Sequence, residues 1–333
     1  MDLKECPVCG VGEENFEIID VPDVVENTNA INVVIIGGGI AGLTVASELR
    51  SRNKKANITI ISKENHLPYN RTLLTKSFNA DLENIAVKPI SFYEENNINL
   101  LLGTEVAKII PNKKLIRLED EAEVSYDYLV LANGSKSIML NSSNFNKQNV
   151  YGIRTKEDVL GLRKALGKGN KTITIVGGGV LGLELASELA LENKVNIIEK
   201  APYLMFNNFE LKDSQALKKF LASKQINVYE NTSIIKYNYD NVILEDETKL
   251  DTDFIVYSIG VASNIQIAKD CGIETNRGVL VNDYLETNIS NIYACGDVAE
   301  FAGRVVAFES FRNNLVNSHE FCFILRIFSN NRV

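Results

Sequence analysis

A strand, a glycine-rich loop and a helix follow one another twice in this chain, and this repeat constrains the fold more than any other feature. The first copy has an apolar stretch at 31–36, a loop at 37–42 and a helical pattern at 43–50. The second copy has the same three parts at 171–176, 177–182 and 183–191. Gly37 and Gly177 lie 140 positions apart, as do Gly42 and Gly182. This regular spacing predicts two α/β domains of one kind.

The similarity continues downstream of each copy. A second apolar strand follows at 57–61 and again at 195–198. β-Meanders with polar turns then begin near 104 and 232, and they end in the apolar segments 128–131 and 254–257. The expected fold class is therefore α/β, with two Rossmann-like, three-layer (ββα) domains.

The glycines of the two loops have the spacing that a pyrophosphate-binding turn requires. Gly37 permits a tight turn, Gly39 allows the backbone to approach a phosphate, and Gly42 lets the helix pack on the strand. The helix N-terminus then offers unpaired N–H groups to an anion. Because the motif occurs twice in the right context, it predicts two dinucleotide sites. Their expected binding residues are Gly37, Gly39, Ile40, Ala41 and Gly42 in the first copy, and Gly177, Gly179, Val180, Leu181 and Gly182 in the second.

The residue that ends the second strand distinguishes the two ligands. In the second copy it is Glu199, which can accept both ribose hydroxyls and would repel a 2′-phosphate, so it favours NAD(H). Lys200 follows and weakens this preference slightly. In the first copy the equivalent residue is Ser62, and Glu64 two positions later is an alternative ribose ligand.

Four further segments follow in a characteristic order: 66–76, 128–135, 254–264 and 291–299. Together with the glycine loops they resemble the FAD-dependent pyridine nucleotide oxidoreductases, most closely the rubredoxin and ferredoxin reductases and the flavin portion of nitrite reductase. The resemblance covers about residues 31–308. It implies an NAD-binding domain at 141–257, inserted into an FAD-binding domain formed by 31–140 and 258–333.

The resemblance also implies a role for individual residues. Lys76 would lie near the reactive flavin nitrogen, and Glu184 beside the nicotinamide. Asp297 would accept a hydrogen bond from the ribityl chain of FAD. The segment 70–73 departs from the family pattern, which makes the assignment of its loop less specific. The other implied cofactor-binding residues are Arg71, Val106, Ala132, Gly134, Gly260 and Gly296.

Composition excludes several classes of partner. The net charge of −8 argues against nucleic acid or anionic membrane as a partner. No apolar run reaches the roughly 18 residues of a membrane span, and the N-terminus lacks the apolar region of a secretory signal, so we expect a cytoplasmic protein.

The two histidines need no catalytic role, because hydride transfer between nicotinamide and flavin requires stacking and not a general base.

The positions of the cysteines suggest that electrons leave the flavin directly, to an external carrier. None lies between Cys9 and Cys271, so a disulfide beside the flavin is not expected, and Cys271 and Cys295 are predicted to be packing thiols. Residues 1–30 form a separate segment in which Cys6 and Cys9 resemble one knuckle of rubredoxin. A full iron or zinc site needs four ligands, so a relic or a docking tag is favoured over a metal centre.

The resemblance implies an enzyme that passes electrons from NADH through FAD to rubredoxin or ferredoxin. An alternative is an NADH oxidase or diaphorase that uses oxygen or quinone. A third is a truncated nucleotide-binding remnant without activity, because residues 309–333 do not resemble the C-terminal domain typical of this family. The sequence leaves the oligomeric state open.

Overall fold

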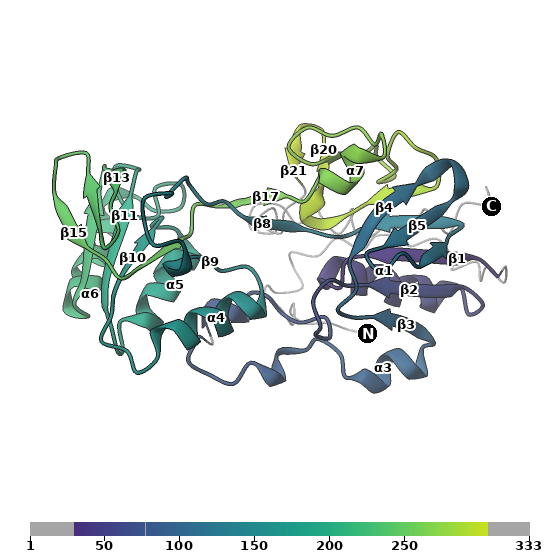
Figure 1. The fold of residues 1–333 in the computed structure, drawn as a ribbon, viewed down its shortest axis with the longest axis horizontal. Coiled ribbons are helices and arrows are strands. Elements are labelled where there is room, and N and C mark those ends of the chain that lie inside the picture. The colour runs from purple at the N-terminus through teal and green to yellow at the C-terminus, as the bar shows by residue number, and fades with distance from the viewer. Residues whose placement is uncertain (1–29, 77, 306–333) are drawn as a thin grey trace, which may run out of the picture. The chain divides into compact units, whose positions relative to one another are not determined.

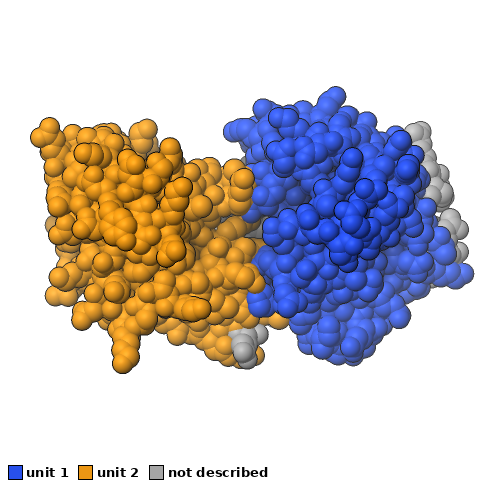
Figure 2. Space-filling view, viewed as in Figure 1, with its two compact units in different colours: residues 1–69, 87–135, 263–333 blue, residues 70–86, 136–262 orange. Residues whose placement is uncertain are grey.

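The computed structural model describes residues 30–76 and 78–305, which form two α/β units (Figure 1). The described part of unit 1 comprises 30–69, 87–135 and 263–305, and that of unit 2 comprises 70–76, 78–86 and 136–262 (Figure 2). By their contacts, residues 70–86 group with unit 2, whereas the sequence placed them in the first domain. The assignment of one cofactor to each domain remains a prediction.

Unit 1 is built on a five-stranded parallel sheet in the order β3-β2-β1-β7-β19. Its strands are β1 (Asn32–Ile36), β2 (Asn57–Ile61), β3 (Ile98–Leu101), β7 (Tyr128–Leu131) and β19 (Ile292–Ala294). The helix α1 (Ile40–Arg52) connects β1 to β2. Such an order puts the carboxyl ends of β1, β7 and β19 side by side at one edge of the sheet.

Alternation along β1 produces the predicted three layers of unit 1. Val33 and Ile35 pack in one apolar cluster with Leu43 and Leu49 of α1. Val34 and Ile36 pack in another cluster, which includes Ile109, Ile116 and Leu118 from the meander β4 (Val106–Ile110), β5 (Leu115–Leu118) and β6 (Glu123–Ser125). Because both faces of the sheet are covered, each of these side chains stabilises the unit by about 1.5–3 kcal/mol.

Unit 2 repeats this plan with a sheet in the order β12-β11-β10-β16-β9. Its strands are β9 (Val150–Gly152), β10 (Thr172–Val176), β11 (Lys194–Glu199), β12 (Ile226–Glu230) and β16 (Phe254–Tyr257). The helix α5 (Val180–Leu189) joins β10 to β11, and the meander is β13 (Ile234–Tyr237), β14 (Asn241–Leu244) and β15 (Lys249–Asp251). The fifth strand differs, because β9 precedes the repeat whereas β19 follows it.

The remaining elements connect or cover these sheets. Unit 1 also contains α3 (Ile90–Glu95), α7 (Gln266–Asp270), β18 (Val279–Leu280), β20 (Ala299–Phe301), β21 (Arg304–Val305), and the 3₁₀ helices η3 (Pro111–Lys113) and η5 (Gly296–Val298). Unit 2 contains α2 (Leu73–Lys76), α4 (Lys156–Leu166), α6 (Leu211–Ser223), η2 (Glu83–Ile85) and η4 (Lys147–Asn149). The strands β8 (Ser135–Ser137) and β17 (Val261–Ser263) pair where the chain passes between the units. Within the described residues, no helix has the length and apolar character needed to cross a membrane.

The structure shifts the expected start of both repeat helices. The loops were expected to extend to Gly42 and Gly182, but α1 begins at Ile40 and α5 at Val180. Gly39 and Gly179 are the N-cap residues, so the last glycine of each motif lies in the first helical turn. The strands at 57–61, 128–131 and 254–257 have the expected bounds.

Candidate functional site

The loop at 37–42, glycine loop 1, can be formed only with glycine at two of its positions. Gly37 has a φ of +123°, and a Cβ atom there would lie 2.1 Å from the carbonyl oxygen of Ala132. A Cβ atom on Gly42 would lie 2.1 Å from the carbonyl oxygen of Gly37. The backbone of this loop therefore packs directly on the residue that follows β7 and on itself, as expected for a turn between strand and helix.

Gly39 differs from these two glycines because its side-chain position is open. A Cβ atom on Gly39 would meet nothing within 4 Å. Gly39 caps α1 without a side-chain hydrogen bond, and the first turn of α1 contains no acidic residue. The start of α1 thus has a glycine surface and a positive helix end that fit the phosphates of a dinucleotide.

Other predicted flavin-site residues of unit 1 gather around this loop at the carboxyl ends of β7 and β19. A Cβ atom on Gly296 would lie 2.9 Å from the Cβ atom of Ala41, and one on Gly134 would meet nothing within 4 Å. Asp297, in η5, is held in place by two serines. Ser135 Oγ donates to Asp297 Oδ2 at 3.0 Å, and Ser263 Oγ donates to the Asp297 backbone oxygen at 2.6 Å. Sequence reasoning missed both serines.

The register of the two sheets aligns Ser62 with Glu199. Ile36 pairs with Ile61 in unit 1, and Val176 pairs with Ile198 in unit 2, so the next residue is Ser62 in one and Glu199 in the other. Ser62 Oγ would lie 2.6 Å from a Cβ atom on Gly38.

The other predicted residues of unit 1 lie near this strand end or on the meander. Glu64 Oε2 accepts a hydrogen bond from the hydroxyl of Tyr69 at 2.5 Å. Val106 begins β4 and packs against the apolar cluster on the meander side. The ribose role of Glu64 and the adenine role of Val106 stay predictions.

The loop at 177–182, glycine loop 2, has the same construction. Gly177 has a φ of +113°, and a Cβ atom there would lie 2.2 Å from the carbonyl oxygen of Ser258. A Cβ atom on Gly182 would lie 2.2 Å from the carbonyl oxygen of Gly177, whereas one on Gly179 would meet nothing within 4 Å. Ser258, the counterpart of Ala132, was not singled out in the sequence.

Glu199, the last residue of β11, lies against glycine loop 2. Its Oε2 accepts from the N–H of Gly178 at 2.6 Å, and its Oε1 accepts from the N–H of Ala201 at 2.7 Å. A carboxylate oxygen has more than one acceptor site, so both oxygens can still accept a hydroxyl donor. The two backbone bonds hold the carboxylate in a fixed position beside the loop.

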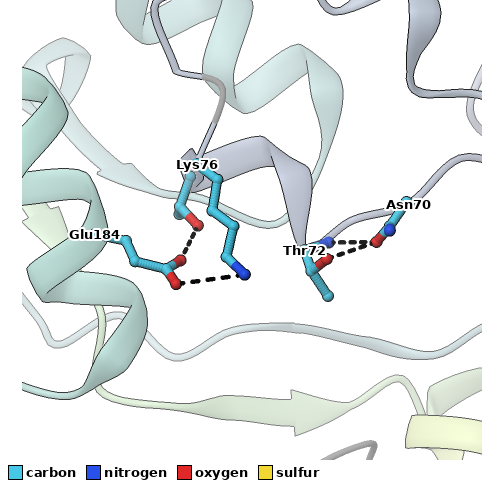
Figure 3. A network of polar contacts seen from close by, with 5 residues as sticks. Asn70, Thr72, Lys76 and Glu184 are labelled. Carbon is cyan, nitrogen blue, oxygen red and sulfur yellow. Dashed lines mark hydrogen bonds and ion pairs between the residues drawn. The ribbon is translucent and has the colours of Figure 1, made fainter. Parts of the chain in front are cut away.

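The predicted catalytic residues Lys76 and Glu184 lie together within unit 2. Figure 3 shows their side chains pointing toward each other from α2 and α5, with Lys76 Nζ at 3.8 Å from Glu184 Oε1. Thr75 Oγ1 donates to Glu184 Oε2 at 2.8 Å, so one carboxylate contacts two successive residues of α2. The sequence named the lysine and the glutamate but not their contact, nor Thr75.

Two further predicted residues of unit 2 have structural partners. Arg71 Nη1 donates to the backbone oxygen of Arg154 at 2.8 Å. The backbone oxygen of Gly260 accepts from the N–H of Ile138 at 3.0 Å. Before α2, the side-chain oxygen of Asn70 accepts from both the N–H and the hydroxyl of Thr72 (Figure 3).

The model of one protein family, the pyridine nucleotide-disulphide oxidoreductases, matches residues 31–316. This chain belongs to that family. It is 31% identical to the rubredoxin-NAD(+) reductase of Pseudomonas putida over 294 residues, which cover 84% of this chain and 76% of that protein. It is 32% identical to the nitrite reductase [NAD(P)H] of Bacillus subtilis, covering 81% of this chain but only 34% of that longer protein.

A solved structure supports the same fold for this family member. The structure of the covalent complex of putidaredoxin reductase with putidaredoxin matches with a TM-score of 0.78 and 27% identity. The match covers 90% of this chain and 76% of that chain. The Rossmann-type α/β fold and the family expected from the motifs are thus confirmed, and membership of this family implies FAD and NADH.

The family name includes a disulphide, but the cysteines that the structure describes are unpaired. Cys295 is buried and Cys271 is half-buried, and both are free thiols. Burial raises the pKa of Cys295 to about 12 and also raises the pKa of Cys271. Both shifts disfavour the thiolate, which is the reactive form of a cysteine. The described ranges contain no group of three or more potential metal ligands, while Cys6 and Cys9 lie outside them.

Proposed function

We propose that this protein is an NADH-dependent flavoprotein reductase that passes electrons through FAD to a small electron-transfer protein. The observation that carries the proposal is the pair of glycine loops with different surroundings. Glycine loop 1 is accompanied by Gly134 and Asp297, and glycine loop 2 by Glu199. These different surroundings support two distinct dinucleotide sites in one chain, one for FAD and one for NADH.

Unit 1 is the proposed FAD site. Gly39 and the N-terminus of α1 would receive the pyrophosphate, because neither a side chain nor an acidic group occupies that helix end. Asp297 would accept a hydrogen bond from the ribityl chain, in a carboxylate position that Ser135 fixes. Bound FAD would supply two-electron acceptance from NADH and one-electron release to the acceptor.

Unit 2 is the proposed NADH site. Gly179 and the N-terminus of α5 would bind the pyrophosphate, and Glu199 would accept the ribose hydroxyls. A 2′-phosphate would bring two negative charges close to this carboxylate, so NADPH would be the poorer substrate. Glu184 would lie beside the nicotinamide, and its contact with Lys76 would keep a cation near the reacting end.

The acceptor we propose is a rubredoxin or a ferredoxin, since relatives named for rubredoxin reduction match over most of this chain. Oxygen or quinone is the second candidate, and the lack of any cysteine in the segment 66–76 argues against a thiol-dependent oxidase. We further propose a cytoplasmic location. Iron or zinc binding at Cys6 and Cys9 is also a proposal, which metal analysis of the purified protein would test.

A visible spectrum of the purified protein tests the function. We expect flavin absorption that bleaches under anaerobic conditions with NADH and more slowly with NADPH. Adding oxidised rubredoxin or ferredoxin should then restore the flavin absorption. A protein that binds FAD but is not bleached by NADH would refute the NADH site, and a colourless protein that fails to take up added FAD would refute the flavin site. Faster reoxidation by oxygen or quinone than by either carrier would favour the second candidate.

A further inference from the structure

Glu230 lies next to Glu199 but is used quite differently. Both residues end neighbouring parallel strands, and they are paired in register across β11 and β12. Glu199 faces glycine loop 2, as described above. The side chain of Glu230 is only 14% exposed, and it contacts the loop that follows Glu199. This loop, residues 200–205, is called the post-strand loop below.

Glu230 holds the post-strand loop through a backbone hydrogen bond. Its Oε1 accepts from the N–H of Leu204 at 3.0 Å, and its Oε2 accepts from Lys218 Nζ of α6 at 2.5 Å. The Lys218 side chain is half-exposed, so its cation neutralises a nearly buried carboxylate. An ion pair of this kind fixes a side chain when further hydrogen bonds satisfy its oxygens, and Leu204 supplies one here.

The post-strand loop in turn holds glycine loop 2. Leu204 is fully buried, and its Cδ2 atom would lie 2.4 Å from a Cβ atom on Gly178. The N–H of Met205 donates to the carbonyl oxygen of Gly178 at 3.1 Å. The N–H of Gly178 donates to Glu199, so both backbone polar groups of this glycine are bonded: its N–H to Glu199, and its carbonyl oxygen to the post-strand loop.

From this chain of contacts we infer that Glu230 is a positioning residue for the NADH site, oriented by Lys218. It keeps the post-strand loop against Gly178, and thereby keeps glycine loop 2 and Glu199 in the arrangement that binds the adenosine and pyrophosphate half of NADH. The inference rests on the proposed NADH site in unit 2. It assigns no contact between Glu230 and the nucleotide.

Loss of Glu230 should therefore weaken nucleotide binding without changing the chemistry. If the loop is in place only about a tenth of the time in Glu230→Ala, the dissociation constant rises roughly tenfold. The same factor is expected for NADH and for ADP-ribose, which lacks the nicotinamide. The rate of flavin reduction at saturating NADH should remain within about twofold of the wild type, because the bound arrangement is the same.

Two variants separate positioning from general stability. Glu230→Gln keeps an oxygen that can accept from the N–H of Leu204, so the affinity of this variant for ADP-ribose should stay within roughly threefold of the wild-type value. Glu210→Ala removes a carboxylate that forms an exposed ion pair with Lys212 at the start of α6, where both side chains are 76% exposed. This matched control changes charge in the same region and should leave affinity unchanged.

The test is the dissociation constant of ADP-ribose, measured by calorimetry on the FAD-loaded protein, together with the rate of flavin reduction. The inference is supported if Glu230→Ala weakens the binding of ADP-ribose and of NADH by the same factor, while Glu210→Ala weakens neither. It is overturned if Glu230→Ala binds ADP-ribose like the wild type, if Glu210→Ala has the same effect, or if the rate at saturation falls instead of the affinity. A wild-type protein that retains FAD but binds no ADP-ribose would refute the NADH site itself, and this inference with it. If Glu230→Ala fails to fold, Lys218→Met, which removes only the cation that orients Glu230, decides instead: weaker ADP-ribose binding supports the inference, and wild-type affinity overturns it.

Discussion

Replacing Gly39 or Gly179 by alanine should weaken nucleotide binding, whereas replacing Gly42 or Gly182 should destabilise the fold, and the structure gives the reason. A Cβ atom on Gly39 or Gly179 meets nothing within 4 Å, and both residues have an extended backbone that alanine adopts easily. A Cβ atom on Gly42 or Gly182 would lie 2.1 or 2.2 Å from a carbonyl oxygen of the same loop. The first pair thus tests binding, and the second pair tests folding.

The expected magnitudes follow from these distances. Cβ contacts below 3.0 Å essentially do not occur, so Gly42→Ala must move the helix or the loop by almost an ångström. Because the opposing atom belongs to the main chain, we expect a loss of about 1–3 kcal/mol or more in the free energy of unfolding. Gly39→Ala creates no such clash, and the gain from restricting the unfolded chain is opposed by the lower N-cap preference of alanine, so the stability of the protein without FAD should change by less than about 1 kcal/mol.

Nucleotide binding, unlike stability, should be weakened directly by alanine at Gly39 and Gly179. A methyl group at Gly39 would occupy the space in which the FAD pyrophosphate is expected to approach the backbone, so FAD affinity should fall at least tenfold (about 1.4 kcal/mol). Gly179→Ala should weaken NADH binding by a similar factor and leave the FAD content unchanged. Urea unfolding of the FAD-free protein and titrations with FAD and with NADH measure both quantities. Normal FAD affinity in a folded Gly39→Ala protein would refute the phosphate assignment.

Three other perturbations have defined expectations. Arg50 is buried and donates to five backbone oxygens, those of Asn53, Lys54, Ala56, Asn96 and Asn97. A lysine cannot reach all five, so Arg50→Lys should lower the free energy of unfolding by roughly 2–4 kcal/mol. A loss below about 1 kcal/mol would contradict this role. Burial alone would raise the pKa of Glu300, but hydrogen bonds from Gly278 and Asn276 and the nearby Arg277 outweigh it, and its pKa lies below the ordinary value of 4.5. Ionised Glu300 therefore stabilises the fold above pH 4.5 and loses this contribution as the pH falls through its lowered pKa. In urea unfolding, the stability advantage of the wild type over Glu300→Gln should shrink as the pH is lowered through and below 4.5. An advantage independent of pH would be contrary evidence. Glu199→Ser, which copies the residue at the equivalent position of unit 1, should reduce the ratio of kcat/KM for NADH over NADPH by at least about tenfold, and an unchanged ratio would show that Glu199 does not select the coenzyme.

Much of the architecture could be predicted because the repeat specifies it locally. Alternate residues of β1 face opposite clusters, and the apolar strands 128–131 and 254–257 have the predicted bounds. The starts of α1 and α5 were predicted three residues late, because a glycine was interpreted as loop although glycine in a first helical turn allows close packing. Propensity scales alone disfavour glycine inside a helix and so mislead here.

The contacts that organise the candidate sites could not be predicted in the same way. Thr75 and Glu184 are 109 residues apart in the sequence, and Ser135 and Asp297 are 162 apart. No periodicity or motif links such residues, because their proximity depends on how the strands and helices pack. Residues 70–86 group with unit 2 for the same reason: Asn79 donates to Glu188, and Arg163 donates to the backbone oxygen of Ala80.

The repeat also explains why the two sites differ in the way they do. Packing requires Gly37, Gly42 and their counterparts Gly177 and Gly182, because a side chain there would collide with the backbone. The residue at the end of the second strand, Ser62 or Glu199, is under no such requirement. A serine at position 62 and a carboxylate at position 199 both fit against the same loop glycine, Gly38 or Gly178. We therefore propose that a phosphate-binding loop is common to both units, while the residue at the strand end selects the nucleotide. In unit 2 we propose that Glu199 makes this selection, and that the neighbouring Glu230 helps to position it by holding the post-strand loop against glycine loop 2.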